Sequence, residues 1–249
     1  VIIYAHHKKD PVIEEATSIL DKLNLKPHKI AIEEPFNWNR VTELYNETKK
    51  LKPDEWWIVA DDDELQLYSK PIQDIVYECE DSGWEFVTGG FIDRIGENGT
   101  FPKINDDSDV WKEMPNAGFF RYPLSLANPN KVTLMKGSVD VVSGQHVDFG
   151  DGKNSWGTSH SKRYPIEKNF TQVHHFKWDY SVLQRLKEVS KSNLIESFSE
   201  EYKKMLSAIE YLDYKIDLGE RGYMFQRVDK PNYNSYRYWD RLRKIITDI

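Results

Sequence analysis

The chain contains almost no cysteine. Cys79 is the only cysteine among 249 residues, so neither an internal disulfide framework nor a cysteine-based zinc knuckle can form. A chain of this length can bury a core without such cross-links. Long apolar runs are missing as well, since no stretch approaches the roughly 18 apolar residues that a membrane-spanning helix needs. These absences exclude a disulfide-rich mini-protein and a polytopic membrane protein.

Basic charge is scarce relative to acidic charge. The chain has 34 Lys and Arg residues against 41 Asp and Glu, a net charge of -7. Nucleic acid binding requires a basic surface, so we expect no nucleic acid partner. The motifs G-x-G-x-x-G, Walker A and G-x-S-x-G are absent too, which removes the commonest dinucleotide, P-loop and hydrolase readings.

The first residues do not form a secretory signal, because no basic segment precedes an apolar run and a small-residue cleavage site. We therefore expect a cytoplasmic protein. The chain begins at Val1, and we interpret it as trimmed at its start or as a domain of something longer.

Strands and helices are expected to alternate over residues 1–92. Apolar runs predict strands at 1–5, 29–32, 56–60 and 86–92. Helices are expected after Asp10-Pro11, over 41–51 and after Pro71, where apolar residues recur at helical spacing. This order predicts an α/β fold with a mostly parallel or mixed sheet and flanking helices. Ligands of such sheets bind beyond the carboxyl ends of the strands.

The alternation stops after residue 92. Residues 93–130 are rich in Gly, Pro, Asn and Asp and are expected to form a long binding loop. Strands are predicted at 131–142 and 171–178, and helices at 179–189, 199–216 and 236–249. We expect one domain with a C-terminal helical extension.

The most informative segment is the acidic run Asp61-Asp62-Asp63-Glu64, which directly follows a predicted buried strand. Clustered carboxylates repel one another and raise each other's pKa, and a divalent cation such as Mg²⁺ or Mn²⁺ relieves this conflict. If the strand geometry continues, Asp61 and Asp63 point to one side and can share the cation. The alternative is a solvated acidic turn in which Asp62 or Asp63 caps a helix.

Two further segments accompany this run: Gly90-Phe91-Ile92-Asp93-Arg94-Ile95 with its following Asn98-Gly99 turn, and Val173-His174-His175-Phe176-Lys177-Trp178. Together with residues 56–64, they resemble nucleotide-sugar-dependent glycosyltransferases of the GT-A fold, of the family-2-like bacterial type found in capsule or lipopolysaccharide gene sets. The resemblance is spread over most of residues 1–190. One departure is that the usual first strand with an Arg-Asn-Glu segment is not visible, so that residues 1–5 correspond to the second strand of that fold.

The resemblance implies a single GT-A-like catalytic domain over 1–249. Residues 1–92 form its nucleotide-sugar-binding half, 93–190 its acceptor and metal half, and 191–249 its helical extension. It also implies a polysaccharide-building enzyme that takes a nucleotide-sugar donor and a glycan or lipid-linked glycan acceptor, with inversion at the sugar carbon. The cofactor is Mn²⁺ or Mg²⁺.

Site residues follow from the same resemblance. Asp61 and Asp63 hold the metal, together with His175 or, as the alternative, His174, because neighbouring strand residues face opposite sides. The donor-binding residues are Asp61, Asp62, Glu64, Lys177 and His146. Both histidines of the 174–175 pair could instead be hydrogen-bonded core residues, and His146 could be an ordinary surface histidine.

An inverting transfer needs a carboxylate that deprotonates the acceptor hydroxyl. The candidates for this catalytic base are Asp93, Asp109 and Asp148, and the residues do not select among them. Asp93 could equally pair with Arg94, and Asp109 belongs to a loop that could simply be solvated.

Aromatic residues offer sugar-stacking surfaces, and Trp111, Phe119, Phe120 and Tyr122 fall in the predicted binding loop. Residues 221–249 combine basic and aromatic side chains, which suits either peripheral contact with a membrane or a helix that packs back on the domain. Two other functions stay open: a non-catalytic carbohydrate-binding module of the same fold, and another Mg²⁺-dependent phosphate enzyme such as a nucleotidyltransferase.

Overall fold

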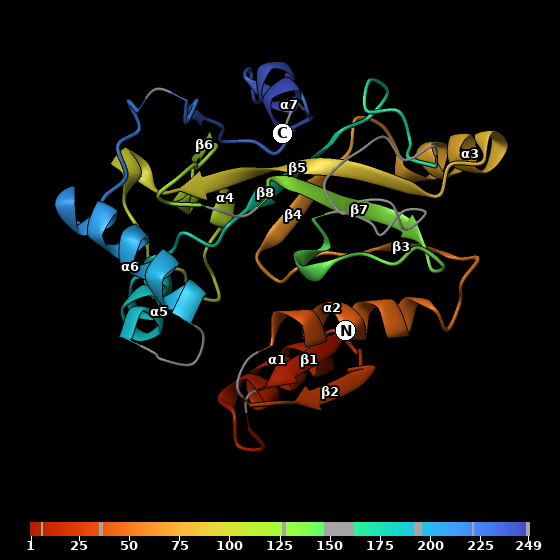
Figure 1. Ribbon diagram of the computed structural model, residues 1–249, viewed down its shortest axis with the longest axis horizontal. Helices are drawn as coiled ribbons and strands as arrows, with labels where there is room; N and C mark the ends of the chain where they lie inside the picture. The colour runs from red at the N-terminus through yellow and green to blue at the C-terminus, as the bar shows by residue number, and fades with distance from the viewer. Residues whose placement is uncertain are drawn as a thin grey trace.

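The computed structural model describes residues 1–5, 7–34, 37–125, 128–146, 162–191, 196–220 and 222–247. Its fold is mixed α/β, with a main sheet between a small N-terminal layer and a C-terminal helix (Figure 1). Among these described residues, no helix carries an apolar stretch long enough to cross a membrane.

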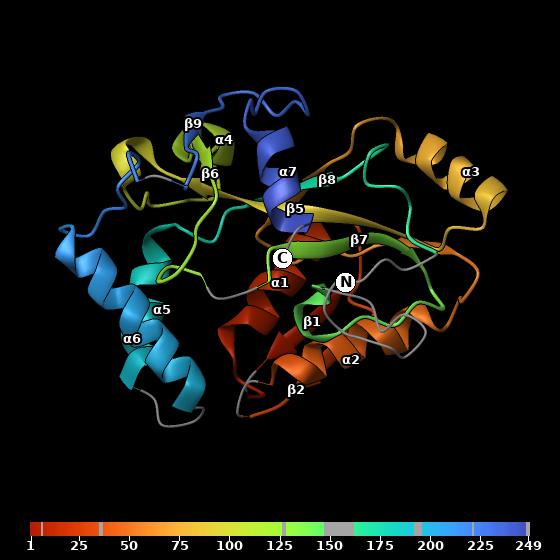
Figure 2. The ribbon, with the colours of Figure 1, turned by 45° about the horizontal axis from the view of Figure 1, so that its top comes forward.

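The N-terminal layer consists of two parallel strands and two helices. Strand β1 (Ile2–Ala5) pairs with β2 (Lys29–Ile32), and α1 (Pro11–Lys22) connects them. Helix α1 begins as predicted, because the Asp10 side chain accepts a hydrogen bond from the Val12 amide and Pro11 occupies the first turn. Helix α2 (Trp38–Lys49) is the part of this layer that lies next to the main sheet (Figures 1 and 2).

The main sheet is built around the long strand β5 (Phe86–Ile95). On one side, β5 pairs antiparallel with β7 (Asn130–Lys136) along its first half and with β6 (Asn116–Gly118) near its end. It also pairs with β8 (Thr171–His175), which runs parallel to it. The remaining strands are antiparallel to their partners: β3 (Trp56–Ile58) on β7, β4 (Glu64–Leu67) on β8, and β9 (Gln226–Arg227) on β6.

The sheets are therefore mixed, and antiparallel pairings predominate among the described strands. The expectation of a mostly parallel sheet is wrong. The physical reason is that β7 lies between β3 and β5 and runs antiparallel to both, so these two strands of the predicted alternation are not neighbours in the sheet.

Helices cover the sheet and its ends. Helix α3 (Ile72–Ser82) lies at one end, and α5 (Tyr180–Lys191) with α6 (Glu196–Tyr211) lies at the other (Figure 1). Helix α7 (Trp239–Thr247) covers the face opposite α2 (Figure 1). Its Trp239, Leu242 and Ile246 are buried in the same core cluster as Ile92 and Phe170. The C-terminal segment thus packs back on the domain with its apolar side.

The predicted long loop at 93–130 holds more regular structure than expected. It contains the end of β5, a 3₁₀ turn at Glu97–Gly99, the single-turn helix α4 (Val110–Glu113) and strand β6. Each piece is too short to generate a recognisable hydrophobic period. A second 3₁₀ turn, Ser143–Gln145, follows β7.

Candidate active site

The acidic run forms a tight turn between β3 and β4 rather than a continued strand. The Glu64 amide donates to the Asp61 carbonyl at 3.2 Å, and the Asp61 amide donates to the Glu64 carboxylate at 3.3 Å. The turn brings its first and last acids together, whereas strand geometry would have placed them on opposite sides. The expected grouping of Asp61 with Asp63 on one side of a strand is therefore wrong.

A buried lysine lies beneath this turn. Lys131 of β7 places its Nζ 3.0 Å from Asp61 Oδ2 and 2.7 Å from Glu64 Oε1. The side chains of Lys131 and Glu64 are each only 1% exposed. Burial opposes the charged amine, but the two carboxylates outweigh it and raise the pKa of Lys131 above its usual value. Lys131 is therefore a permanent internal cation of the site.

Asp61 is held from a second direction by the helix that lies under the sheet. The Tyr45 hydroxyl of α2 donates to Asp61 Oδ1 at 3.0 Å. Burial would raise the pKa of Asp61, yet the charge and hydrogen bond of Lys131 lower it. Asp61 is thus ionised, and each of its oxygens already has a partner.

The second half of the site is a row of side chains across three neighbouring strands. His175 of β8 is paired with Asp93 on β5 and with Glu64 on β4, and paired residues on adjacent strands project to the same face of a sheet. His175 Nδ1 lies 3.0 Å from Asp93 Oδ1, and His175 Nε2 lies 3.4 Å from Asp63 Oδ2. The Phe91 ring stacks on the imidazole, with ring centroids 4.9 Å apart.

Asp93 is itself held firmly behind His175. Its Oδ1 also accepts a hydrogen bond from Trp178 Nε1 at 3.0 Å, and its Oδ2 accepts one from the Phe120 amide at 3.2 Å. The Asp93 side chain is 8% exposed. These contacts give Asp93 the geometry of a residue that orients an imidazole.

The histidine and its outer carboxylate shift each other's protonation. Burial lowers the pKa of His175, but the hydrogen bonds to Asp63 and Asp93 outweigh burial and raise that pKa to about 9. Burial likewise favours the neutral acid at Asp63, but the hydrogen bond and charge of His175 lower the Asp63 pKa to about 2. Without another cation, the pair is imidazolium and carboxylate at neutral pH.

The bottom of the site is buried, and its rim is open to solvent. The side chains of Asp61 and Asp63 are 37% and 33% exposed, whereas the lysine and glutamate beneath them are closed off from solvent. Residues 61–64 and 93 bring five carboxylates together, and the directly paired cations are Lys131 and His175. The excess negative charge at an accessible rim favours binding of a further cation.

The donor set allows a divalent metal at one place. Among the described residues, no group of three or more His, Cys, Asp or Glu side chains is arranged to hold a metal. A pair does fit: donors on one cation at ligand distances of about 2.1 Å lie about 3–3.5 Å apart, and Asp63 Oδ2 and His175 Nε2 are 3.4 Å apart. Mg²⁺ and Mn²⁺ are commonly held by one or two protein ligands that leave the other positions to substrate phosphates and water.

The structure separates the two histidines of the predicted pair. The buried His174 ring lies against Trp111, and its Nε2 is 3.2 Å from Gln172 Oε1. Burial and then the charge of Arg94 lower the pKa of His174 well below its usual value. His174 therefore packs among core side chains away from the acids, and the geometry favours His175 as the ligand.

The other predicted donor-binding residues lie around the acid cluster: the charges of Lys131, Asp61 and His175 act on His146, and the charge of Lys177 acts on Asp63. His146 lies on the edge of the Phe91 ring, with its Nδ1 2.9 Å from the Asn130 carbonyl; burial and the charge of Lys131 lower its pKa to about 4. Lys177 lowers the pKa of Asp63 by its charge and lies over the Trp178 ring. Asp62 is the exposed acid of the turn.

One candidate for the catalytic base, Asp109, lies elsewhere in the structure. Asp109 caps α4 by accepting a hydrogen bond from the Trp111 amide at 3.1 Å, and it pairs with Lys112. This capping role accounts for the acid without catalysis. Asp148 lies outside the described residues.

The expected aromatic platform does not form as a surface. Phe119 and Phe120 are buried in the core, and Trp111 packs against the Arg94 guanidinium 4.9 Å from its ring centroid. Tyr122 alone of the four is largely exposed, at 62%.

Sequence reasoning missed Lys131 and Tyr45. A signal for Lys131 was present, because this lysine opens the apolar stretch Val132-Thr133-Leu134-Met135 of a predicted strand. A lysine so placed is buried and needs an acidic partner. Tyr45 carried no such signal, since it fits the apolar face of α2 as a core residue.

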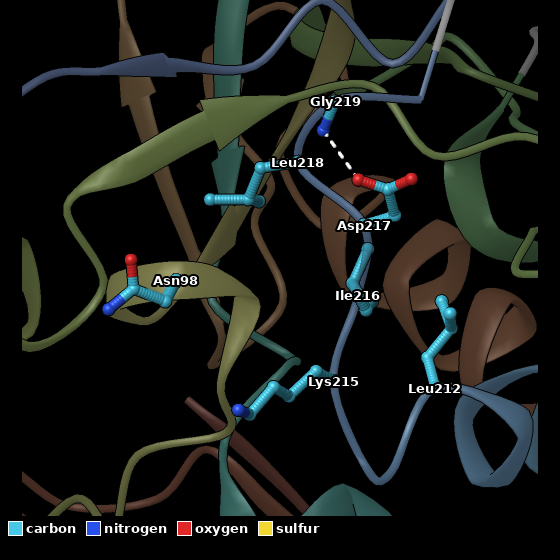
Figure 3. Close-up of a pocket in the computed structure, with 7 residues that line it drawn as sticks. All are labelled: Asn98, Leu212, Lys215, Ile216, Asp217, Leu218 and Gly219. Atoms are coloured by element: carbon cyan, nitrogen blue, oxygen red, sulfur yellow. Dashed lines mark hydrogen bonds between the residues drawn. The ribbon is translucent and has the colours of Figure 1, made fainter.

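A surface pocket lies elsewhere, between the turn after β5 and the segment that follows α6 (Figure 3). In it, the Gly219 amide donates to Asp217 Oδ1 at 2.8 Å. The pocket shares no lining residue with the acid cluster. Its lining residues are Asn98, Leu212, Lys215, Ile216, Asp217, Leu218 and Gly219.

Comparisons with known proteins add no identification. No family model matches the chain, and neither a curated protein nor a solved structure matches it.

Proposed function

We propose that the protein is a metal-dependent glycosyltransferase of GT-A type that moves a sugar from a nucleoside diphosphate donor to a glycan hydroxyl. One observation carries the proposal: the rim carboxylate Asp63 lies 3.4 Å from His175 Nε2, while Asp93 holds Nδ1 of the same ring. A carboxylate behind an imidazole is the usual support of a histidine that binds metal.

In this proposal, Asp63 and His175 hold Mn²⁺ or Mg²⁺, which, when bound, stabilises negative charge on the departing diphosphate. Asp93 fixes the imidazole so that Nε2 faces the rim. Lys177 adds positive charge near Asp63, on the side where phosphate oxygens gain from it.

In this proposal, Asp93 has a positioning role and not that of the base. Three donors already occupy its oxygens, and the side chain is nearly closed off from solvent. An acceptor hydroxyl could reach Asp93 only after these hydrogen bonds were broken, and each such bond to a charged group contributes about 1.5–3 kcal/mol.

The resemblance of the three sequence segments to family-2-like enzymes favours sugar transfer over other metal-dependent phosphate chemistry. The products separate the two. A glycosyltransferase releases a nucleoside diphosphate, whereas a nucleotidyltransferase releases pyrophosphate and a phosphohydrolase releases phosphate.

A thermal-shift panel tests the proposal. The ligands are UDP, GDP, CMP and dTDP, each with and without Mn²⁺, and an oligosaccharide. The panel is run on the wild type, on Asp63→Asn and on Asp54→Asn as a control at an exposed acid before β3. Ligand at a hundredfold excess over Kd stabilises the folded state by about 2.7 kcal/mol. We expect a Mn²⁺-dependent shift with one nucleotide, kept by Asp54→Asn and lost in Asp63→Asn.

Two outcomes would contradict the proposal. One is a nucleotide shift of equal size in Asp63→Asn. The other is no shift with any nucleotide together with a shift from oligosaccharide, which would indicate a carbohydrate-binding module.

A further inference from the structure

A single buried lysine contacts both ends of the β3–β4 turn. Lys131 Nζ contacts the first acid of the turn, Asp61, and the last, Glu64, while the exposed Asp62 and the half-buried Asp63 lie between them. The Phe176 amide donates to the Asp63 carbonyl at 2.8 Å and ties the turn to the end of β8.

Lys131 is on a strand that does not flank the β3–β4 turn. Lys131 lies near the start of β7, whose neighbours in the sheet are β3 and β5. It is one of the largest fully buried side chains in the described part of the molecule. Its ammonium also lies 5.3 Å from the centroid of the Phe91 ring, which stacks on His175. One cation thus touches both halves of the site.

Each carboxylate oxygen of Asp61 has a partner within the protein, although the side chain is 37% exposed. Lys131 takes one carboxylate oxygen and the Tyr45 hydroxyl takes the other. The other acid of the motif, Asp63, forms its ion pair with His175 and not with a lysine.

We propose that Lys131 and Tyr45 are positioning residues that clamp Asp61, so that Asp61 shapes the turn while Asp63 is the carboxylate that binds the cation. This inference rests on the proposed function in taking the cation to bind at Asp63 and His175. It divides the Asp-x-Asp motif of this chain into Asp61, which two side chains of the protein hold, and Asp63, which is paired only with the other proposed ligand, His175.

The test is the affinity for Mn²⁺ alone, measured by electron paramagnetic resonance on folded protein well below its unfolding temperature. Asp63→Asn removes the proposed ligand. Tyr45→Phe removes one hydroxyl from the clamp and keeps the ring. Lys131→Met removes the buried cation, and Lys136→Met is the matched control, because Lys136 ends the same strand and pairs with Glu80 of α3.

Loss of a group that supports a metal ligand typically weakens metal binding about 10–100-fold. We expect such a loss in Lys131→Met, a smaller one in Tyr45→Phe, and none in Lys136→Met. Asp61→Asn should keep measurable Mn²⁺ binding with weakened affinity, whereas Asp63→Asn should abolish it. Because Tyr45→Phe deletes a single oxygen, it remains informative should Lys131→Met fail to fold.

The outcomes separate this inference from the proposed function. Mn²⁺ binding that is unchanged in Asp63→Asn, or absent from the wild type, overturns both. Binding that is lost in Asp63→Asn and equally lost in Asp61→Asn, or unchanged in Tyr45→Phe and Lys131→Met, overturns the clamp alone.

Discussion

Replacing Lys131 by Met should strongly destabilise the protein, even before any ligand is considered. The side chains of Lys131 and Glu64 are both 1% exposed and lie 2.7 Å apart. Removing one partner of a buried ion pair leaves an uncompensated charge and costs about 3–5 kcal/mol. For a chain of this size, each kcal/mol lowers the unfolding temperature by about 2–4 °C, so we expect a fall of about 6–20 °C.

A control and a double-mutant cycle test the reasoning by urea unfolding. Lys136, on the same strand as Lys131, pairs with Glu80 of α3 at a similar distance, 3.1 Å, but these two side chains are 23% and 47% exposed. Lys136→Met should therefore cost no more than about 1 kcal/mol. The double variant Lys131→Met/Glu64→Leu should recover much of the lost stability, because no buried charge is left at either position.

The reasoning is refuted if Lys131→Met costs as little as Lys136→Met. It is also refuted if Lys131→Met and Glu64→Leu are simply additive, since residues in direct contact should show a coupling free energy.

Three other outcomes are expected. Burial lowers the pKa of Lys49 to about 8, so on raising the pH the folded state loses this proton before the unfolded state does. The unfolding free energy of the wild type should therefore rise relative to that of Lys49→Met between pH 8 and 10. The same pH dependence for both proteins in urea titrations would contradict this. Gly99 and Gly83 have similar positive φ angles, +76° and +75°, but a Cβ on Gly99 would lie 1.9 Å from the Ile216 carbonyl oxygen, whereas a Cβ on Gly83 would meet open space. Gly99→Ala should therefore lower the unfolding temperature much more than Gly83→Ala, which costs only the usual left-handed penalty of about 1 kcal/mol. Equal falls in the unfolding temperature would contradict the clash. Cys79 is fully buried and burial raises its pKa to about 12; it should react with Ellman's reagent only when urea unfolds the chain, and fast labelling of the native protein would show that this core opens.

Local structure was readable from the sequence where it depends on neighbouring residues. Asp10 and Pro11 mark the start of α1, and Pro71 precedes α3, because caps and prolines act over a single turn. Strand β2 lies at the predicted residues, and α7 begins close to its predicted start. Strands β4, β6 and β9 were not predicted because they are short and, unlike β1 and β2, contain no apolar run.

The sheet and the site depend on contacts between residues that are distant in the sequence, and local hydrophobic patterns do not predict such contacts. Nothing local indicates that β3 pairs with β7, or that Lys131 reaches Asp61 across 70 positions of sequence. The acids themselves were found, because a run of four carboxylates after an apolar strand is unusual. How they divide between Lys131 and His175 follows from the turn, which strand alternation alone does not predict.

The most direct test of the central claim is the position of a bound metal in crystals grown with Mn²⁺ and the nucleoside diphosphate selected by the thermal-shift panel. Anomalous scattering locates Mn²⁺ directly. We predict one peak at ligand distance, about 2–2.3 Å, from both Asp63 and His175 Nε2, with a diphosphate oxygen on the same ion. A nucleotide bound elsewhere, or a peak that these two side chains do not contact, would contradict the account.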